Sequence, residues 1–134
     1  MGLPEVILLD THVVVWMLGA LDRLSVGAIR AIEQARVEGG LAISSMTLFE
    51  LAHLKFKQRI QVEGPIEVLL EDVSRRFVVK GITAPIAIAS ARFTEPYPRD
   101  PMDRLIGATA LVEGLPLVTA DQRIRQAGQV QTIW

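Results

Sequence analysis

Short apolar runs alternate along this chain with longer segments of helical pattern, and this alternation limits the possible folds more than any other feature. Five short runs have the length and the content of branched residues that are typical of strands. They cover residues 6–9, 41–43, 77–79, 117–119 and 130–133. The segments between them favour helices at about 11–21, 25–38, 45–59, 65–76, 85–93, 104–113 and 121–126. Strands that alternate with helices predict a parallel sheet between helical layers, which is an α/β fold.

The chain has 134 residues, the size of one compact domain, and half of them are hydrophobic. It has no cysteine, which excludes disulfides, thiolate nucleophiles and zinc–sulfur sites. The net charge of −1 offers no overall attraction for nucleic acid, so such contacts depend on local basic groups such as Lys55, Lys57 and Arg59. No apolar run is long enough to cross a bilayer, and residues 1–5 lack the basic start of a secretory signal. We therefore expect a soluble domain in the cytoplasm.

Four acidic residues lie where the predicted sheet places functional groups. Asp10 directly follows the first predicted strand, and Asp121 comes shortly after the fourth. Glu50 and Asp103 lie near the starts of two predicted helices. Because functional groups in open α/β sheets gather beyond the carboxyl ends of the strands, we expect these four carboxylates to meet in one pocket.

Such a cluster of carboxylates needs a partner, because two unit charges about 4 Å apart repel by roughly 4 kcal/mol at an effective dielectric constant of about 20. Either some carboxylates hold protons, or a divalent cation neutralises the group. An all-oxygen ligand set suits Mg²⁺ or Mn²⁺. Such an ion lowers the pKa of a bound water and screens the charge that develops on a phosphate. The cluster therefore indicates phosphodiester hydrolysis.

Helix capping is an alternative interpretation for three acidic residues. Asp100 precedes Pro101 and has the position of an N-cap. Asp103 then falls in the first helical turn, where an acid stabilises the exposed amides and the helix dipole. Asp121 can cap the short last helix in the same way.

Glu50 also has a structural alternative, since it can belong to a solvent-facing stripe with Thr47 and His53 at helical spacing. Asp10 is the hardest acid to explain structurally, because a carboxylate that ends a buried strand is costly unless it is satisfied. His12 and His53 are not spaced as a pair of metal ligands, and we interpret both as structural. The functional prediction therefore rests on the set of acids rather than on any one of them.

Four blocks of the sequence occur in the order that is typical of one known family. They are residues 8–12 (LLDTH), 45–51 (SMTLFEL), 100–110 (DPMDRLIGATA) and 117–121 (LVTAD). Together they resemble the PIN-domain family, and more narrowly the VapC-type toxins of bacterial type II toxin–antitoxin pairs. The resemblance implies one PIN-like domain over residues 1–134, a three-layer α/β/α sandwich with a roughly five-stranded parallel sheet.

The resemblance also implies an endoribonuclease that depends on Mg²⁺ or Mn²⁺. Matched block by block, the family's metal-binding and catalytic acids are Asp10, Glu50, Asp103 and Asp121. Thr119 matches the family residue that helps to orient the site. In this scheme a metal-activated water, deprotonated by a neighbouring carboxylate, attacks the RNA phosphorus in line.

Proteins of this type commonly form homodimers, cleave RNA such as tRNA or rRNA, and are silenced by an antitoxin protein whose tail fills the active-site groove. The resemblance therefore implies an RNA substrate, an antitoxin partner and a homodimer. Asp100 belongs to the motif of one branch, and both interpretations of it, metal ligand or helix cap, stay open at this point. The number of ions, the RNA target and the antitoxin are equally open.

Two other classes of function compete with this prediction. A phosphoryl-transfer domain, either a receiver or a phosphatase of the haloacid-dehalogenase type, also places an aspartate after a first parallel strand. The phosphatase pattern needs a second aspartate two residues later, where this chain has His12, and the acidic pair and late lysine of a receiver are not evident. The other alternative is a binding or scaffold module whose acids are only caps.

Overall fold

The structure is a computed structural model that describes residues 6–134, so residues 1–5 of the predicted domain and the predicted lack of a secretory start lie outside the described residues. Within residues 6–134, one parallel sheet has the strand order β3-β2-β1-β4-β5, which confirms the α/β prediction. Its strands are β1 (Val6–Leu9), β2 (Gly40–Ser44), β3 (Val78–Lys80), β4 (Leu117–Val118) and β5 (Thr132–Ile133). The helices are α1 (Thr11–Gly19), α2 (Val26–Glu38), α3 (Ser45–Phe56), α4 (Ile66–Arg76), α5 (Ala84–Arg92), α6 (Pro101–Glu113) and α7 (Gln122–Ala127), with a 3-10 turn η1 (Leu21–Arg23). None of the helices in this described part combines the length and the apolar character that a membrane span requires.

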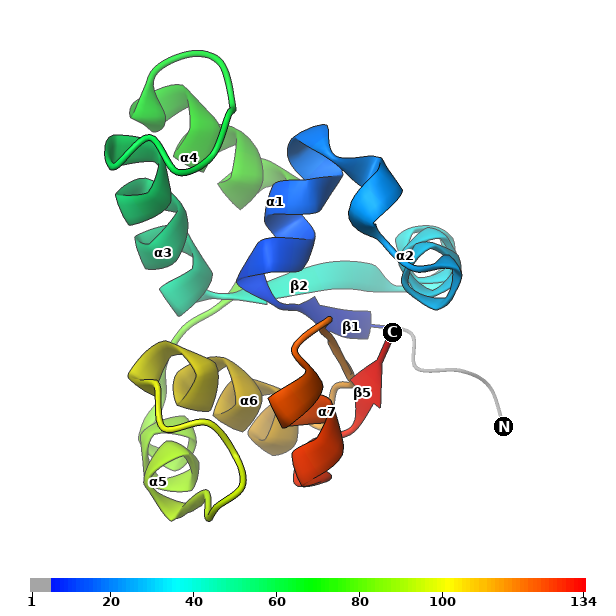
Figure 1. The fold of residues 1–134 in the computed structure, drawn as a ribbon, viewed down its shortest axis with the longest axis vertical. Coiled ribbons are helices and arrows are strands. Elements are labelled where there is room, and N and C mark those ends of the chain that lie inside the picture. Colours follow the sequence, from blue (N-terminus) through cyan, green and yellow to red (C-terminus); the bar gives the residue numbers. More distant parts are fainter. Residues whose placement is uncertain (1–5) are drawn as a thin grey trace.

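The sheet lies between two layers of helices, as the predicted sandwich requires. Figure 1 shows α1–α4 on one side of the sheet and α5–α7 on the other. Strand residues alternate between the two layers because of the pleat. Ile7 and Leu9 belong to the core on the side of α1, α2 and α4, whereas Leu8 belongs to the core on the side of α6. Both faces of β1 are therefore covered, which explains why its sequence is apolar throughout.

Several boundaries differ from the sequence prediction by a few residues. The first helix ends at Gly19, and η1 follows it. Helix α3 ends at Phe56 rather than near residue 59, because Gln58 adopts a left-handed φ of 56°. The last strand covers two residues instead of four, since β5 pairs only with the two-residue β4. These differences lie at the ends of elements and leave the order of the strands unchanged.

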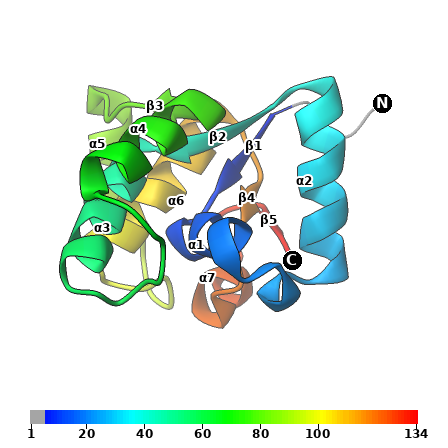
Figure 2. The ribbon, with the colours of Figure 1, turned by 90° about the horizontal axis from the view of Figure 1, so that it is seen from above.

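The parallel arrangement places the carboxyl ends of the strands at one edge of the sheet. The register pairs Leu9 of β1 with Ile43 of β2 and with Val118 of β4. Helices α1 and α3 begin directly after β1 and β2, and Figure 2 shows β1 running toward the start of α1. Side chains that follow β1, β2 and β4 therefore lie close together at this edge.

Candidate active site

Asp10 lies between β1 and α1, and both of its carboxylate oxygens accept hydrogen bonds. Oδ1 accepts from the main-chain N–H of Thr11 at 2.8 Å, and Oδ2 accepts from the hydroxyl of Thr119 at 2.7 Å. Asp10 is only 8% exposed. Burial raises the pKa of Asp10, although the two hydrogen bonds lower it. The strand-end carboxylate is thus satisfied, as its burial demands, while its negative charge remains costly.

Thr119 connects two of the predicted acids. It follows β4 and is fully buried; its hydroxyl donates to Asp10 and accepts from the main-chain N–H of Asp121 at 3.1 Å. Asp121 caps α7, with Oδ1 accepting from the N–H of Arg123 at 2.9 Å and of Ile124 at 3.3 Å. The capping interpretation of Asp121 therefore holds. It does not remove Asp121 from the acidic group, because the charge of Asp121 raises the pKa of Asp10.

Glu50 approaches the same place from α3 and is held by a threonine of α1. Thr11 donates its hydroxyl to Oε1 of Glu50 at 2.6 Å, and this hydroxyl lies 3.0 Å from that of Thr47. Thr11 and Thr47 are both buried, so the alternative interpretation of a solvent-facing stripe is wrong at Thr47, which packs against α1 instead. Burial raises the pKa of Glu50, and the negative charge of Asp10 contributes to the increase. Glu50 and Asp10 therefore face a common space.

Asp103 comes from the first turn of α6. Its pKa rises from 3.8 to about 7. Burial is the largest cause, followed by the negative charges of four acids: Asp10, Asp100, Asp121 and Glu50. In the part of the chain that the structure describes, the main chain of Asp103 forms hydrogen bonds but its carboxylate forms none. This carboxylate therefore lies among other negative charges and has no hydrogen-bond donor from residues 6–134.

Asp100 is the N-cap of α6. Its Oδ1 accepts from the N–H of Met102 at 2.8 Å and of Asp103 at 3.3 Å, and Pro101 follows in the first helical position. The capping prediction for Asp100 is thus correct. Asp100 is exposed, and its charge contributes to the raised pKa of Asp103 and Glu50.

Hydrogen bonds through Thr11 and Thr119 bring Asp10, Glu50 and Asp121 near one another at the carboxyl edge of the sheet, and the negative charges of these acids contribute to the raised pKa of Asp103. They supply only oxygen ligands, which Mg²⁺ and Mn²⁺ prefer, and a cation would relieve the crowding of charge. Within residues 6–134, no three His, Asp or Glu side chains form a ready-made cluster for a metal ion. Because Mg²⁺ commonly binds through one or two carboxylates and keeps several waters, the donor set fits an ion held partly through water.

Comparison with known sequences identifies the family. The family model described as "PIN domain" matches residues 7–130, a range that contains all four predicted acids. The chain belongs to the PIN-domain family. A curated relative, Ribonuclease VapC22 from Mycobacterium tuberculosis, is 38% identical over 130 residues, which are 96% of this chain and 98% of the relative. This PIN-domain chain is therefore of the VapC type.

Solved structures show the same PIN fold. VapBC-1 from nontypeable Haemophilus influenzae has a TM-score of 0.72 at 18% identity, covering 95% of this chain and 96% of that one. A DNA-bound VapBC from Salmonella typhimurium has a TM-score of 0.69 at 22% identity, covering 94% and 95%. A toxin–antitoxin complex from Klebsiella pneumoniae has a TM-score of 0.68 at 23% identity, covering 96% of both chains. At such identities the likeness confirms the fold.

Thr11 is an orienting residue of this PIN domain that the sequence prediction missed. Its main-chain N–H binds Asp10 and its hydroxyl binds Glu50, so one residue holds two acids. The Asp-Thr pair in the first family block is the available signal, but the residue that the Thr11 hydroxyl contacts lies 39 positions away. A contact of that kind depends on the packing of α1 against α3, which local sequence does not specify.

The two histidines and the predicted basic group differ in how near they lie to the acids. His53 lies 2.9 Å from the carbonyl oxygen of Phe49 through Nδ1, which agrees with a structural interpretation. His12 is exposed, and its charge lowers the pKa of Asp10, so it lies beside the acids rather than away from them. Lys55 donates to the carbonyl of Val62, which uses part of the predicted basic group to hold a loop.

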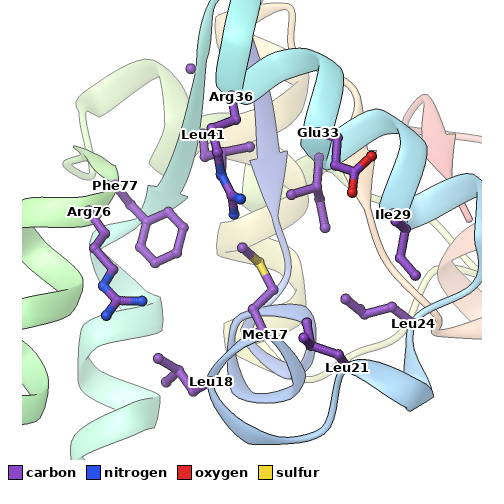
Figure 3. Close-up of a pocket in the computed structure, with 12 residues that line it drawn as sticks. Met17, Leu18, Leu21, Leu24, Ile29, Glu33, Arg36, Leu41, Arg76 and Phe77 are labelled. Carbon is purple, nitrogen blue, oxygen red and sulfur yellow. The ribbon is translucent and has the colours of Figure 1, made fainter.

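A pocket of about 830 Å³ lies at the opposite edge of the sheet from the acids, where β2 begins. Figure 3 shows it open between α1, α2 and the end of α4. None of the four predicted acids lines this pocket, whose walls are mostly apolar. The lining residues are Met17, Leu18, Leu21, Leu24, Ile29, Ile32, Glu33, Arg36, Gly40, Leu41, Arg76 and Phe77.

Proposed function

We propose that this PIN-domain protein is a divalent-metal-dependent endoribonuclease, the toxin of a VapBC-type toxin–antitoxin pair, acting on RNA in the cytoplasm. The observation that carries the proposal is the set of hydrogen bonds through Thr11 and Thr119 that joins Asp10 to Glu50 and to Asp121 at the carboxyl edge of the sheet. The charges of these acids also raise the pKa of Asp103. The 38% identity to a relative named as a VapC ribonuclease supports the same activity.

In this proposal Asp10, Glu50 and Asp103 hold Mg²⁺ or Mn²⁺ directly or through water, and Asp121 helps to position it. A bound divalent ion would neutralise the crowded carboxylates, increase the acidity of a nearby water and stabilise the charge on the phosphate. The threonines supply the rigidity that such chemistry needs. Thr119 holds Asp10, and Thr11 holds Glu50, each through a short hydrogen bond.

The chain's own part in the reaction is proton transfer and orientation. An ionised carboxylate of the group accepts a proton from the attacking water, whose oxygen bonds to phosphorus. The bond from phosphorus to the 3′ oxygen breaks, and that oxygen takes up a proton. The products are then a 3′-hydroxyl and a 5′-phosphate.

Sequencing of RNA ends tests the proposal. Purified protein with Mg²⁺ or Mn²⁺ should produce defined fragments carrying 5′-phosphates, and excess chelator should stop the cleavage. Asp10→Asn should lower the rate about a hundredfold or more because it removes a charged oxygen ligand. Asp22→Asn, which changes an exposed acid of η1, is the matched control and should cleave normally. Full activity of Asp10→Asn, or cleavage in chelator, would contradict the proposal.

For the antitoxin partner we propose the apolar pocket between α1, α2 and α4 as a second docking site, separate from the active-site groove that the family resemblance implies for its tail. An apolar segment of an antitoxin would replace water along these walls. Figure 3 shows Arg36 and Arg76 on either side of Phe77. Two cations and one acid, Glu33, line the pocket, and Arg76 also pairs with Asp72. The remaining excess of positive charge at Arg36 favours a partner segment that carries acidic residues beside its apolar ones. The solved toxin–antitoxin complexes with this fold support the choice of an antitoxin as the occupant.

For the homodimer we propose the surface formed by β3, α5 and the end of α6. Val78, Ile88 and Leu111 are each about half exposed there, although side chains of this kind are normally buried. Lys80 and Glu113 lie 3.9 Å apart, which joins β3 to the end of α6, and α5 packs against α6. Strand β3 is also an edge of the sheet, and a second copy on this surface would cover it.

A further inference from the structure

We propose that Tyr97 and Arg104 are positioning residues, which fix the first turn of α6 and thereby the place of the Asp103 carboxylate. This inference rests on the nuclease function proposed above. Asp10 and Glu50 are held by hydrogen bonds to their own carboxylates, whereas the hydrogen bonds of Asp103 within residues 6–134 involve only its main chain. The place of the Asp103 carboxylate therefore depends on how firmly its helix turn is anchored.

Tyr97 anchors that turn through its hydroxyl. It lies in the loop before α6, and its side chain is fully buried. The hydroxyl donates to the main-chain carbonyl oxygen of Asp103 at 2.7 Å. The ring is stacked on Phe93, with centroids 4.1 Å apart and an angle of 6° between the planes. A buried tyrosine hydroxyl needs a partner, and here the partner belongs to the residue that carries a predicted catalytic acid.

Gly107 makes this contact possible. A Cβ atom at position 107 would lie 2.0 Å from the Tyr97 hydroxyl oxygen and 2.8 Å from Cζ, distances that atoms do not tolerate. Only glycine therefore lets the tyrosine lie directly on the backbone of α6. Position 107 is one helical turn beyond Asp103. The tyrosine hydroxyl therefore contacts the turn that carries the acid, and the ring packs against the next turn.

Arg104 ties the same turn to the preceding loop. Its Nε donates to the carbonyl oxygen of Pro98 at 2.9 Å, and its Nη1 donates to that of Phe93 at 3.0 Å. Both acceptors are main-chain groups of the loop between α5 and α6. Among the ion pairs of residues 6–134, none involves Arg104. The guanidinium therefore binds the loop to the residue next to Asp103 rather than neutralising an acid.

The arrangement explains how an unsupported carboxylate can be held in a crowded site. Repulsion between an ionised Asp103 carboxylate and the neighbouring acids acts to separate them, and a loosely held helix turn would give way to it. Two ties to the loop, one at the carbonyl of Asp103 and one at the adjacent side chain, resist that movement. Mutation of a residue that orients a metal ligand without touching the metal typically lowers metal affinity or activity by about 10–100-fold.

Tyr97→Phe provides the sharpest test, because it removes the hydroxyl and keeps the stacked ring. The measurements are Mn²⁺ binding by isothermal titration calorimetry, RNA cleavage at varied Mn²⁺, and thermal unfolding. We expect Tyr97→Phe and Arg104→Gln to increase the Mn²⁺ dissociation constant and the half-saturating Mn²⁺ concentration about tenfold. Arg99→Gln is the control, since Arg99 is exposed in the same loop and pairs only with Glu95. It should bind Mn²⁺ like the wild type.

Tyr97→Phe alone decides the outcome if Arg104→Gln fails to fold. A lower melting temperature for Tyr97→Phe with unchanged Mn²⁺ binding and cleavage would mean a purely structural role, and would overturn the inference. A wild-type protein that neither binds Mn²⁺ nor cleaves RNA would instead overturn the proposed function. Asp103→Asn serves as the reference for complete loss of this carboxylate, and the effect of Tyr97→Phe should go in the same direction and be smaller.

Discussion

Replacing Asp103 by asparagine should stabilise the metal-free protein at high pH. The pKa of Asp103 rises from 3.8 to about 7 on folding. Between those values the folded state holds a proton that the unfolded state has lost, so stability falls as the pH rises through this window. Asparagine carries no charge at any of these pH values, and the variant should not show that loss.

The size of the effect follows from the two pKa values. Each pH unit between them corresponds to about 1.4 kcal/mol, so the full difference is about 4 kcal/mol for a carboxylate that solvent does not reach. Asp103 is partly exposed, and solvent screening reduces this to about 1–2 kcal/mol. For a chain of this size, that corresponds to a gain of roughly 3–8 °C in melting temperature at pH 8.

Thermal unfolding in chelator at pH 4.5 and pH 8 measures the effect. The wild type and Asp103→Asn should have similar melting temperatures at pH 4.5, where the folded wild type is protonated, and should differ at pH 8. Mn²⁺ should raise the melting temperature of the wild type at pH 8 more than that of the variant, because binding stabilises the folded state by mass action. Asp22→Asn is the control for loss of an exposed acid. Parallel pH profiles for the wild type and Asp103→Asn would refute the reasoning.

Three further predictions concern the orienting contact and the two proposed surfaces. Thr11→Val removes the hydroxyl that binds Glu50, so the initial cleavage rate should fall about tenfold while Thr11→Ser stays active; equal rates would show that the hydroxyl does not matter. Arg76→Glu at the pocket should reduce co-purification of the antitoxin about tenfold or more, whereas Arg75→Glu, which lies outside this pocket, should not. Ile88→Glu should convert a dimer to a monomer in light scattering. The control Val37→Glu, at a residue of α2 that is 85% exposed, should stay dimeric, and a monomeric wild type would contradict the proposed surface.

Much of the fold could be predicted because its determinants are local. A four-residue apolar run identifies β1, and the caps at Ser25, Asp100 and Asp121 depend on residues within three positions of each. The rule for parallel sheets then places the ends of β1 and β4 together, which is why the sequence predicts Asp10 and Asp121 to be neighbours.

The rest depended on contacts between distant segments. Thr47 has the helical spacing of a solvent-facing residue, yet α1 covers it, and only the packing of α1 on α3 decides between those outcomes. Gly107 looks like an ordinary small residue of an apolar helix until the Tyr97 ring is placed on it. The apolar pocket where β2 begins is lined by residues from several elements, so no local pattern in the sequence predicts it.

Capping and chemistry do not compete for these acids, because each carboxylate oxygen has two lone pairs and can accept a hydrogen bond while it faces a cation. Asp121 caps α7 through Oδ1, and its negative charge still raises the pKa of Asp10. Asp10 in turn accepts a hydrogen bond from the first amide of α1 through Oδ1. Helix N-termini favour negative charge, so they make a cluster of acids less costly at the place where parallel strands end. Asparagine caps a helix about as well as aspartate does, whereas alanine does not. At the caps Asp100 and Asp121, asparagine variants therefore keep the helix start and remove the charge. Asp10→Asn also places an amide where Thr119 now donates its hydroxyl, so thermal unfolding of that variant is measured alongside its activity.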